Sequence, residues 1–268
     1  MTATVASTAV AADTPKETVR KGLDAVFTSF DADAVERLFA EDYIQHNPMV
    51  PTGRAPIVGF LPALKKCGIR LTTYRLIAEG DLVLAHNTYD NAQLFGADHI
   101  VGFDLFRVKD GRIVEHWDNI APIAKPNPSG RGQVDGPSDV VDLDKTAANR
   151  ALVSGFITAI LVNGDMSRLA SFFDGDTYAQ HNSQIADGLS GLGGALKALA
   201  AQGITMKYAK VHKIVAEGNV VFAMSEGTFG GKPTAFFDLF RVANGKVAEH
   251  WDVMSEIPEK MAHANGKF

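Results

Sequence analysis

Two aspartates lie among large apolar residues in a sequence block that occurs twice in the chain. The first copy, 103–118, reads FDLFRVKDGRIVEHWD, and the second, 237–252, reads FDLFRVANGKVAEHWD, with eleven of sixteen positions identical. A carboxylate between apolar neighbours loses hydration, so Asp104 and Asp238 could exchange protons near neutral pH as catalytic groups. The alternative is that both are ordinary strand residues, bonded to a backbone group or a histidine.

The block predicts a β-hairpin and assigns its side chains to two faces. An Asp-Gly and an Asn-Gly dipeptide provide favoured two-residue turns between alternating apolar runs. In such a hairpin Asp104 is opposite Trp117, and Phe106 is opposite Glu115, so these side chains share one face. We therefore expect a substrate-binding wall beside each aspartate, formed by Phe106 and Trp117 in the first half and by Phe240 and Trp251 in the second.

The other face of the hairpin is expected to pack one half of the chain against the other. There Arg107 is predicted to pair with Asp118, and a β-bulge would move part of this set to the opposite face. In the first half the set consists of Phe103, Leu105, Arg107, Val114, His116 and Asp118.

A Gln-His-Asn tripeptide precedes each hairpin and contains two more candidate catalytic residues, His46 and His181. Each histidine, with the Asn47 or Asn182 that follows it, could hydrogen-bond a substrate oxygen or orient the aspartate. Equally, the tripeptide could be a turn whose side chains cap backbone groups.

His86 lies in an apolar stretch, 82–89, that predicts a strand. A lone histidine there is more often a buried core residue, and the second copy has Met224 at the corresponding position. Chemistry that needs His86 would therefore belong to the first half alone. The chain's histidines do not show the spacing of metal ligands, so no metal is expected.

The repeat extends well beyond the hairpin and predicts two copies of one domain. Tyr43-Ile-Gln-His-Asn47 corresponds to Tyr178-Ala-Gln-His-Asn182 at an offset of 135, against 134 for the hairpin block. A Pro/Gly-rich stretch between the copies predicts a linker or extended arm. The expected domains are 14–124 and 145–257, joined by a linker at 125–144, with tails at 1–13 and 258–268.

Each copy begins with helical patterns and continues with strands. Thr14-Pro15-Lys16-Glu17 is a capping-box pattern with proline at the first helical position, and apolar residues then recur on one helical face. The strands that follow are separated by turn dipeptides, which is typical of an antiparallel meander. This order predicts an α+β domain with helices packed on one face of a bent sheet.

Composition excludes several classes of protein. With 26 basic and 31 acidic residues the net charge is −5, which argues against a nucleic-acid partner. No apolar run is long enough to span a bilayer, so no membrane association is expected. The single cysteine cannot form an intrachain disulfide, so the expected location is cytoplasmic. The alternative is that the uncharged N-terminal tail is the remnant of an export signal.

These motifs resemble the SnoaL-like polyketide cyclase family of the nuclear transport factor 2-like superfamily. The resemblance rests on Tyr43-Ile-Gln-His-Asn-Pro48, on Asp-Leu-Phe-Arg-Val followed by Glu-His-Trp-Asp in both halves, and on Ile257-Pro-Glu-Lys-Met261. It implies a tandem pair of cone-shaped α+β barrels, in which a curved antiparallel sheet wraps helices around one apolar pocket. It also implies cofactor-free acid/base chemistry by Asp104, Asp238, His46 and His181, and by His86 in the first half.

Two functions remain open from the sequence. The first is a cofactor-independent cyclase, isomerase or dehydratase that acts on a small apolar carbonyl compound by aldol-type chemistry. The second is a non-catalytic protein that binds such a ligand. In both, the halves associate as an intramolecular pseudodimer, and a homodimer of whole chains is a further expectation.

Overall fold

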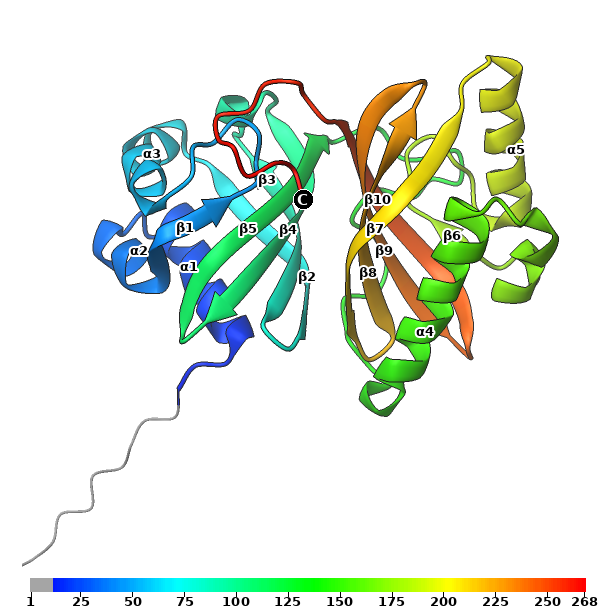
Figure 1. Ribbon diagram of the computed structural model, residues 1–268, viewed down its shortest axis with the longest axis horizontal. Coiled ribbons are helices and arrows are strands. Elements are labelled where there is room, and N and C mark those ends of the chain that lie inside the picture. Colours follow the sequence, from blue (N-terminus) through cyan, green and yellow to red (C-terminus); the bar gives the residue numbers. More distant parts are fainter. Residues whose placement is uncertain (1–11) are drawn as a thin grey trace, which may run out of the picture.

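The computed structural model describes residues 12–268, so the tail predicted at 1–13 lies almost entirely outside the described residues. The chain forms two similar halves whose curved sheets face each other, with the helices on the outside (Figure 1). This arrangement confirms the predicted α+β fold, two tandem cone-like units packed as an intramolecular pair.

The first half contains three α-helices and a five-stranded sheet. The helices are α1 (Pro15–Phe27), α2 (Ala32–Leu38) and α3 (Arg54–Cys67). The strands are β1 (Phe39–Gln45), β2 (Arg70–Glu79), β3 (Leu82–Asp90), β4 (His99–Lys109) and β5 (Arg112–Pro122), with a short 3-10 turn, η1 (Gln93–Phe95), before β4.

The strand order in this sheet is β1-β5-β4-β3-β2, so β1 and β2 form its open edges and the cone is not a closed barrel. Four of the strands pair antiparallel, as predicted, but β1 runs parallel to β5. The predicted antiparallel meander is therefore confirmed for β2 to β5, and β1 joins the edge of this meander as a parallel strand. Because the helix pair α1–α2 leads directly into β1, that strand enters alongside the end of the hairpin meander rather than continuing it.

The second half repeats this plan with the strand order β6-β10-β9-β8-β7. Its helical elements are η2 (Leu143–Lys145), α4 (Thr146–Phe156), the π-helical η3 (Ile157–Val162), η4 (Met166–Phe172) and α5 (Gly188–Ala201). Its strands are β6 (Ala179–Gln180), β7 (Met206–Glu217), β8 (Val220–Phe229), β9 (Lys232–Ala243) and β10 (Lys246–Glu256).

Local sequence signals are realised at the expected places. Thr14 caps α1 through a capping box, in which its hydroxyl accepts from the Glu17 amide and the Glu17 carboxylate accepts from the Thr14 amide. Asp110 and Gly111 between β4 and β5 both have positive φ, of 50° and 72°. Those angles suit the type I′ turns that match the twist of a tight hairpin.

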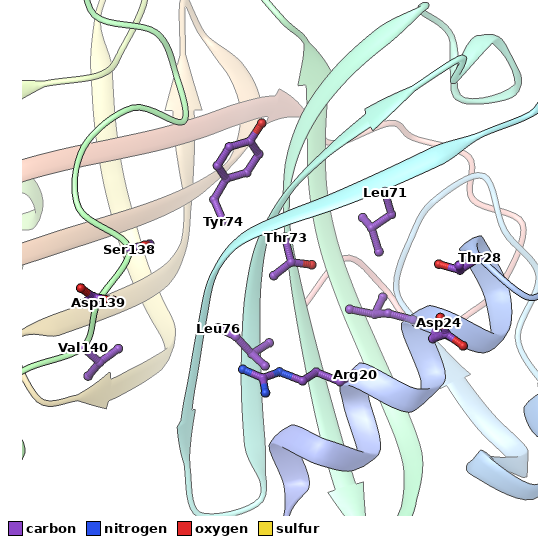
Figure 2. A pocket seen from close by; sticks show the side chains of 11 residues that line it. Arg20, Asp24, Thr28, Leu71, Thr73, Tyr74, Leu76, Ser138, Asp139 and Val140 are labelled. Carbon is purple, nitrogen blue, oxygen red and sulfur yellow. The ribbon is translucent and has the colours of Figure 1, made fainter.

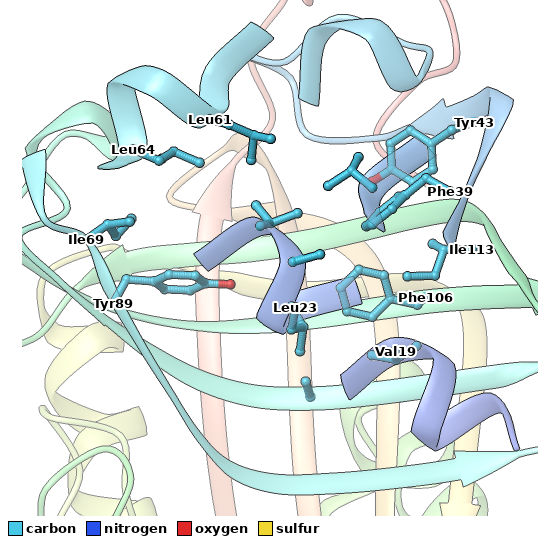
Figure 3. Close-up of a cluster of buried hydrophobic side chains, with 14 of the residues drawn as sticks. Val19, Leu23, Phe39, Tyr43, Leu61, Leu64, Ile69, Tyr89, Phe106 and Ile113 are labelled. Carbon is cyan, nitrogen blue, oxygen red and sulfur yellow. The ribbon is translucent and has the colours of Figure 1, made fainter. Parts of the chain in front are cut away.

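Three apolar clusters hold the described residues together. One lies between the first sheet and its helices (Figure 3), and a second lies between the second sheet and its helices. The third lies between the two sheets, where Phe103, Leu105 and Trp117 meet Phe237, Leu239 and Trp251. The two halves thus share a dry interface core made by one face of each sheet.

The segment between the halves, 123–142, contains no helix or strand and packs on the second half as an extended arm, here called the linker arm. Asn127 Nδ2 donates to the carbonyl of Gln180 at 2.6 Å, and the carbonyl of Gly132 accepts from His181 Nδ1 at 2.7 Å. The linker arm therefore covers the Gln-His-Asn loop of the half that follows it.

The segment after the second half, 258–268, does the reverse and is here called the C-terminal arm. It crosses to the first half (Figure 1), where Asn265 Nδ2 donates to the carbonyl of Gln45 at 2.9 Å. The carbonyl of Gly266 accepts from His46 Nδ1 at 2.8 Å. Each half is thus followed by an arm that covers the Gln-His-Asn loop of the other half.

Among residues 12–268, no helix combines the length and the apolar character that crossing a membrane would require.

Candidate functional site

A β-bulge in each hairpin changes which side chains accompany the aspartates. In the first half Val108 pairs with Ile113 but Arg107 pairs with Glu115, so Val114 is an extra residue. Ala248 is the extra residue in the second half. On the bulged strand, every side chain beyond the extra residue lies on the opposite face from the one predicted for a regular hairpin. The predicted pairing of Asp104 with Trp117 is therefore wrong.

The actual register places Asp104 opposite Asp118, and Phe106 opposite His116. These four side chains lie on the face that packs against the helices. Trp117 lies on the other face, in the cluster between the sheets, and so does Trp251. Neither tryptophan therefore lines the surroundings of its aspartate.

Asp104 is buried, 4% exposed, and accepts hydrogen bonds from three side chains. Tyr89 donates its hydroxyl to Oδ2 at 2.6 Å, and Asn87 Nδ2 donates to the same oxygen at 2.7 Å. His116 Nε2 lies 3.1 Å from Oδ1. Several donors around one buried carboxylate offset the hydration that it has lost.

Gln45 determines which nitrogen of His116 carries a proton. Its side-chain oxygen accepts from the backbone amides of His46 and Asn47, at 2.9 and 2.8 Å, and so must also act as acceptor towards His116 Nδ1 at 3.0 Å. His116 Nδ1 therefore holds a proton, and its Nε2 faces Asp104 Oδ1. The result is a histidine–carboxylate pair of fixed orientation.

Aromatic rings enclose this pair. Phe106 stacks on the His116 ring at a centroid distance of 4.7 Å, and Tyr43 stacks on it at 6.5 Å. Both belong to the cluster under the helices (Figure 3). Burial and nearby Asp104 raise the pKa of Tyr89 well above its usual value, so its hydroxyl stays a neutral donor. Phe106 thus lies beside the acidic group; its contact with a substrate stays a prediction.

The second half contains the same pair with different support. Asp238, 1% exposed, lies 3.0 Å from His250 Nε2, and Gln180 accepts from His250 Nδ1 at 3.1 Å. Phe240 stacks on His250 at 4.7 Å. The tyrosine that bonds the aspartate is Tyr208, which donates its hydroxyl at 3.1 Å. It comes from β7, whereas Tyr89 of the first half comes from β3.

A glycine explains the change of strand. Gly227 follows Met224 by three positions, as Tyr89 follows His86, and a Cβ there would lie 1.9 Å from the carbonyl of Lys207. No tyrosine fits at that position. Ser225 stands where the first half has Asn87, and its hydroxyl has no hydrogen-bond partner in the described part of the chain.

Two charged groups of the second site have shifted pKa values. Burial lowers the pKa of His250, but its hydrogen bond to Asp238 and the charges of Asp252 and Asp238 outweigh burial and raise it overall. Burial raises the pKa of Asp252, and the charge of Asp238 adds to this against the opposing effect of His250. The folded second site therefore holds protons more firmly than free side chains do.

The two predicted loop histidines lie near the pairs but face away from the aspartates. His46 stacks on Trp117 at 5.0 Å, and its Nε2 lies 3.0 Å from Glu115. His181 has the same surroundings, with Trp251 at 4.8 Å and Glu249 at 2.8 Å. Both histidines contact residues of the sheet interface and bind the arms. Either histidine would therefore have to move before it could contact a substrate at the aspartate.

The asparagines of the tripeptides contact the second acid of each site. Asn47 Nδ2 donates to Asp118 at 2.5 Å, and Asn182 Nδ2 donates to Asp252 at 2.8 Å. The predicted pairing of Arg107 with Asp118 is wrong. Because of the bulge, Arg107 donates to Glu115 at 2.9 Å and also pairs with Asp81.

His86 lies on the face of β3 opposite to Asn87 and Tyr89, in the interface between the sheets. It stacks on Phe103 at 4.3 Å, and its Nδ1 accepts from Arg75 Nη1 at 3.1 Å. His86 therefore lies on the opposite face of the sheet from Asp104, because side chains alternate along a strand, and its catalytic role stays a prediction. Burial, with Arg75 and His181, holds the pKa of His86 well below its usual range.

A metal-ligand geometry occurs in the first site. Asp104, His116 and Asp118 present ligand atoms within 4.8 Å of one another. Asp104 and His116 already bond each other, and Lys267 Nζ lies 3.6 Å from Asp118 Oδ1, where it would repel a cation. That no metal takes part stays a prediction.

An open hollow of about 500 Å³ lies elsewhere, between α1, β2 and the linker arm (Figure 2). Arg20 and Asp24 of α1, Thr73 and Tyr74 of β2, and Asp139 of the linker arm line it. Neither Asp104 nor His116 is among the residues that line it.

The sequence did not reveal the groups that hold the aspartates. Gln45 and Gln180 carry a signal, since the glutamine is repeated in both tripeptides, and such a repeat is typical of a positioning residue. Asn87 and Tyr89 carry none, because the second copy replaces them with Ser225 and a glycine.

Comparison with known proteins agrees with the doubled architecture. A family model described as a SnoaL-like domain matches residues 19–116 and again 153–250. None of the curated proteins matches the chain. Solved structures resemble single halves, each covering 40% of this chain.

IdmH, a candidate polyketide cyclase from Streptomyces antibioticus, is 22% identical over 92% of its length, with a TM-score of 0.34. An NTF2-like protein of unknown function from Mesorhizobium loti is 26% identical over 90%, with a TM-score of 0.35. An LEH-like epoxide hydrolase from M. tuberculosis is 19% identical over 82%, with a TM-score of 0.34.

Proposed function

Because the chain belongs to the SnoaL-like domain family, with one copy in each half, we propose that it is a cofactor-independent general acid/base enzyme. Its substrate is a small, largely apolar carbonyl compound. The observation that carries the proposal is the buried pair Asp104–His116, repeated as Asp238–His250 with the same glutamine behind it.

The proposed first step is removal of a proton from the carbon next to the substrate carbonyl. Asp104 takes the proton, the C–H electron pair forms a carbon–carbon double bond, and the carbonyl π electrons move to the oxygen. His116 then donates a hydrogen bond from Nε2 to the enolate oxygen or to the protonated acid. Return of the proton to another carbon gives isomerisation, and attack of the enolate carbon on a second carbonyl gives ring closure.

Access to the aspartate sets a condition on this proposal. Both oxygens of Asp104 are bonded within the protein, so a substrate must displace the Tyr89 or Asn87 hydrogen bond when it enters under the helices. The aromatic walls would then exclude water and favour an apolar substrate.

Exchange of α-protons with solvent tests the chemistry without knowledge of the natural substrate. Small aryl ketones and 1,3-diketones are incubated with the full chain in D2O, and loss of the α-proton signal is followed by NMR. Asp104→Asn combined with Asp238→Asn is expected to slow exchange by about 10²- to 10⁴-fold, the usual contribution of a positioned acid/base group. Asp110→Asn, the same change in an exposed turn, is the matched control and should retain the wild-type rate.

The single variants show which half works. A loss with Asp104→Asn alone assigns the exchange to the first half, and a loss with Asp238→Asn alone assigns it to the second. Exchange catalysed equally well by the double variant would refute the assignment of both aspartates.

A second candidate function is binding without catalysis. It is favoured by the complete internal bonding of Asp104, whose three partners all belong to the protein. In that case the same compounds bind with an affinity that does not change with pH and are recovered unchanged. A bell-shaped pH dependence of exchange would exclude this function.

A further inference from the structure

The linker arm and the C-terminal arm make the same contact with a loop histidine, but the residue that follows this contact is neutral in one arm and charged in the other. The carbonyls of Gly132 and Gly266 both accept from the Nδ1 of a loop histidine, which aligns the linker arm with the C-terminal arm. The next residue is Gln133 in the linker arm and Lys267 in the C-terminal arm. One site therefore receives an arm with an ammonium and the other an arm with an amide.

Lys267 is buried, 6% exposed, and lies against the second acid of the first site. Its Nζ donates to the backbone carbonyl of Asp118 at 2.6 Å and lies 3.6 Å from the carboxylate oxygen Oδ1. A buried ammonium is costly unless an anion lies close by. Burial lowers the pKa of Lys267, and the Asp118 carboxylate and, at longer range, Asp104 act against this lowering.

The first site places two carboxylates side by side. Asp104 and Asp118 occupy directly opposed positions on β4 and β5, so both face the helices. Two such carboxylates in a buried site repel each other, and one of them tends to keep a proton. His116 Nε2 bonds the Asp104 carboxylate, and Lys267 is placed to compensate the charge of Asp118.

The second site has the same pair of acids without the second cation. Asp238 and Asp252 are directly opposed on β9 and β10. Asp252 is bonded by the neutral Asn182, and Gln133 of the linker arm turns away to accept from the amide of Ala124 at 2.8 Å. Consistent with this, burial and the charge of Asp238 raise the pKa of Asp252.

We propose that Lys267 is a positioning residue of the first site, delivered by the arm of the second half, and that it keeps both carboxylates of that site ionised. The two sites then differ chemically. The first has a lysine ammonium beside its second carboxylate, whereas the second has no such cation beside Asp252. The inference deepens the proposed function and rests on it only in treating the aspartate–histidine pairs as sites.

The other ionisable groups around Lys267 and Asp118 leave this balance unchanged. His116 of β5 and Asp104 of β4 form the pair already described. Tyr43 of β1 and Tyr89 of β3 also face the acids, and burial raises the pKa of both well above the usual value, so they remain neutral.

Carboxyl NMR of the full chain, labelled with ¹³C at aspartate, tests the proposal without a substrate. Lys267→Met removes the charge and keeps a similar apolar stem. We expect it to increase by one the number of aspartate carboxyl carbons that titrate above pH 5. Lys267→Arg restores the charge and should return the wild-type number. Gln133→Met, a neutral change at the matching position of the linker arm, should leave the number unchanged.

An unchanged number in Lys267→Met overturns the inference, provided that thermal melting shows a folded chain. If Lys267→Met fails to fold, Lys267→Gln is measured in its place, with the same expected increase. Absence of α-proton exchange in every variant would count against the proposed function and leave this result intact. Where exchange is found, Lys267→Met in the Asp238→Asn background should shift its pH profile, and Lys267→Arg should restore it.

Discussion

Replacement of His86 by methionine tests the assignment of this histidine to the dry interface. His86 is 1% exposed, and its Nε2 has no hydrogen-bond partner within residues 12–268. Met224 occupies the same register position in the second half, opposite Lys213 as His86 is opposite Arg75, and it is fully buried. A methionine side chain is therefore already accommodated at this kind of position.

The expected effect depends on pH, and its sign follows from proton binding. Burial, Arg75 and His181 hold the pKa of His86 well below its usual range, so the folded chain keeps this ring neutral. The unfolded chain binds a proton there below about pH 6.5, so unfolding takes up a proton and wild-type stability falls as pH decreases. Between pH 7.5 and 5.5 the loss amounts to about 1.4 kcal/mol.

The His86→Met variant does not show this decrease in stability at low pH. At pH 7.5 the variant loses the hydrogen bond with Arg75, which lowers the free energy of unfolding by about 1 kcal/mol. It also removes a buried, unpaired N–H, which raises the free energy of unfolding by about the same amount. Its stability relative to wild type should then rise by about 1.4 kcal/mol on going to pH 5.5. For a chain of this size that difference corresponds to a shift in melting temperature of about 3 to 6 °C.

Thermal melting of both proteins at pH 7.5 and 5.5, followed by circular dichroism, measures the difference. The reciprocal variant Met224→His is the control and should acquire the acid sensitivity that His86→Met loses. Parallel melting temperatures of wild type and His86→Met across this pH range would refute the reasoning, because they would mean that the folded chain can protonate His86.

The interface and the second site offer three further tests. Trp251→Phe is expected to lower the free energy of unfolding by about 1 kcal/mol, since Trp251 Nε1 donates to the carbonyl of Asp135 at 2.9 Å. Trp117→Phe should lower the free energy of unfolding by less, because Trp117 Nε1 has no hydrogen-bond partner among the described residues. The urea unfolding midpoints of the two variants measure this difference. Asn119→Ala should cost about 1 to 3 kcal/mol in urea unfolding, since this buried amide donates to two backbone carbonyls of the other sheet. Ser225→Ala should leave the melting temperature unchanged or raise it, and a clear decrease would show that the buried hydroxyl has a partner.

The repeated sequence determined the architecture of this protein. Two copies of one block, turn dipeptides with positive φ and a capping box at Thr14 are local features, and each is realised where the sequence places it. The helices-then-strands order led to the α+β fold because hydrophobic periodicity and turn chemistry act over short distances. The burial of Asp104 and Asp238 also agrees with their apolar neighbours in the sequence.

Tertiary structure alone decided which groups meet those aspartates. One extra residue in each hairpin, Val114 or Ala248, moved His116 and His250 to the aspartates and turned the tryptophans into the interface. A bulge has no sequence signature here, yet it reverses every side chain beyond it. The exchange of arms was equally hidden, because Lys267 lies 149 positions from Asp118 in the chain and meets it only when the two halves pack together.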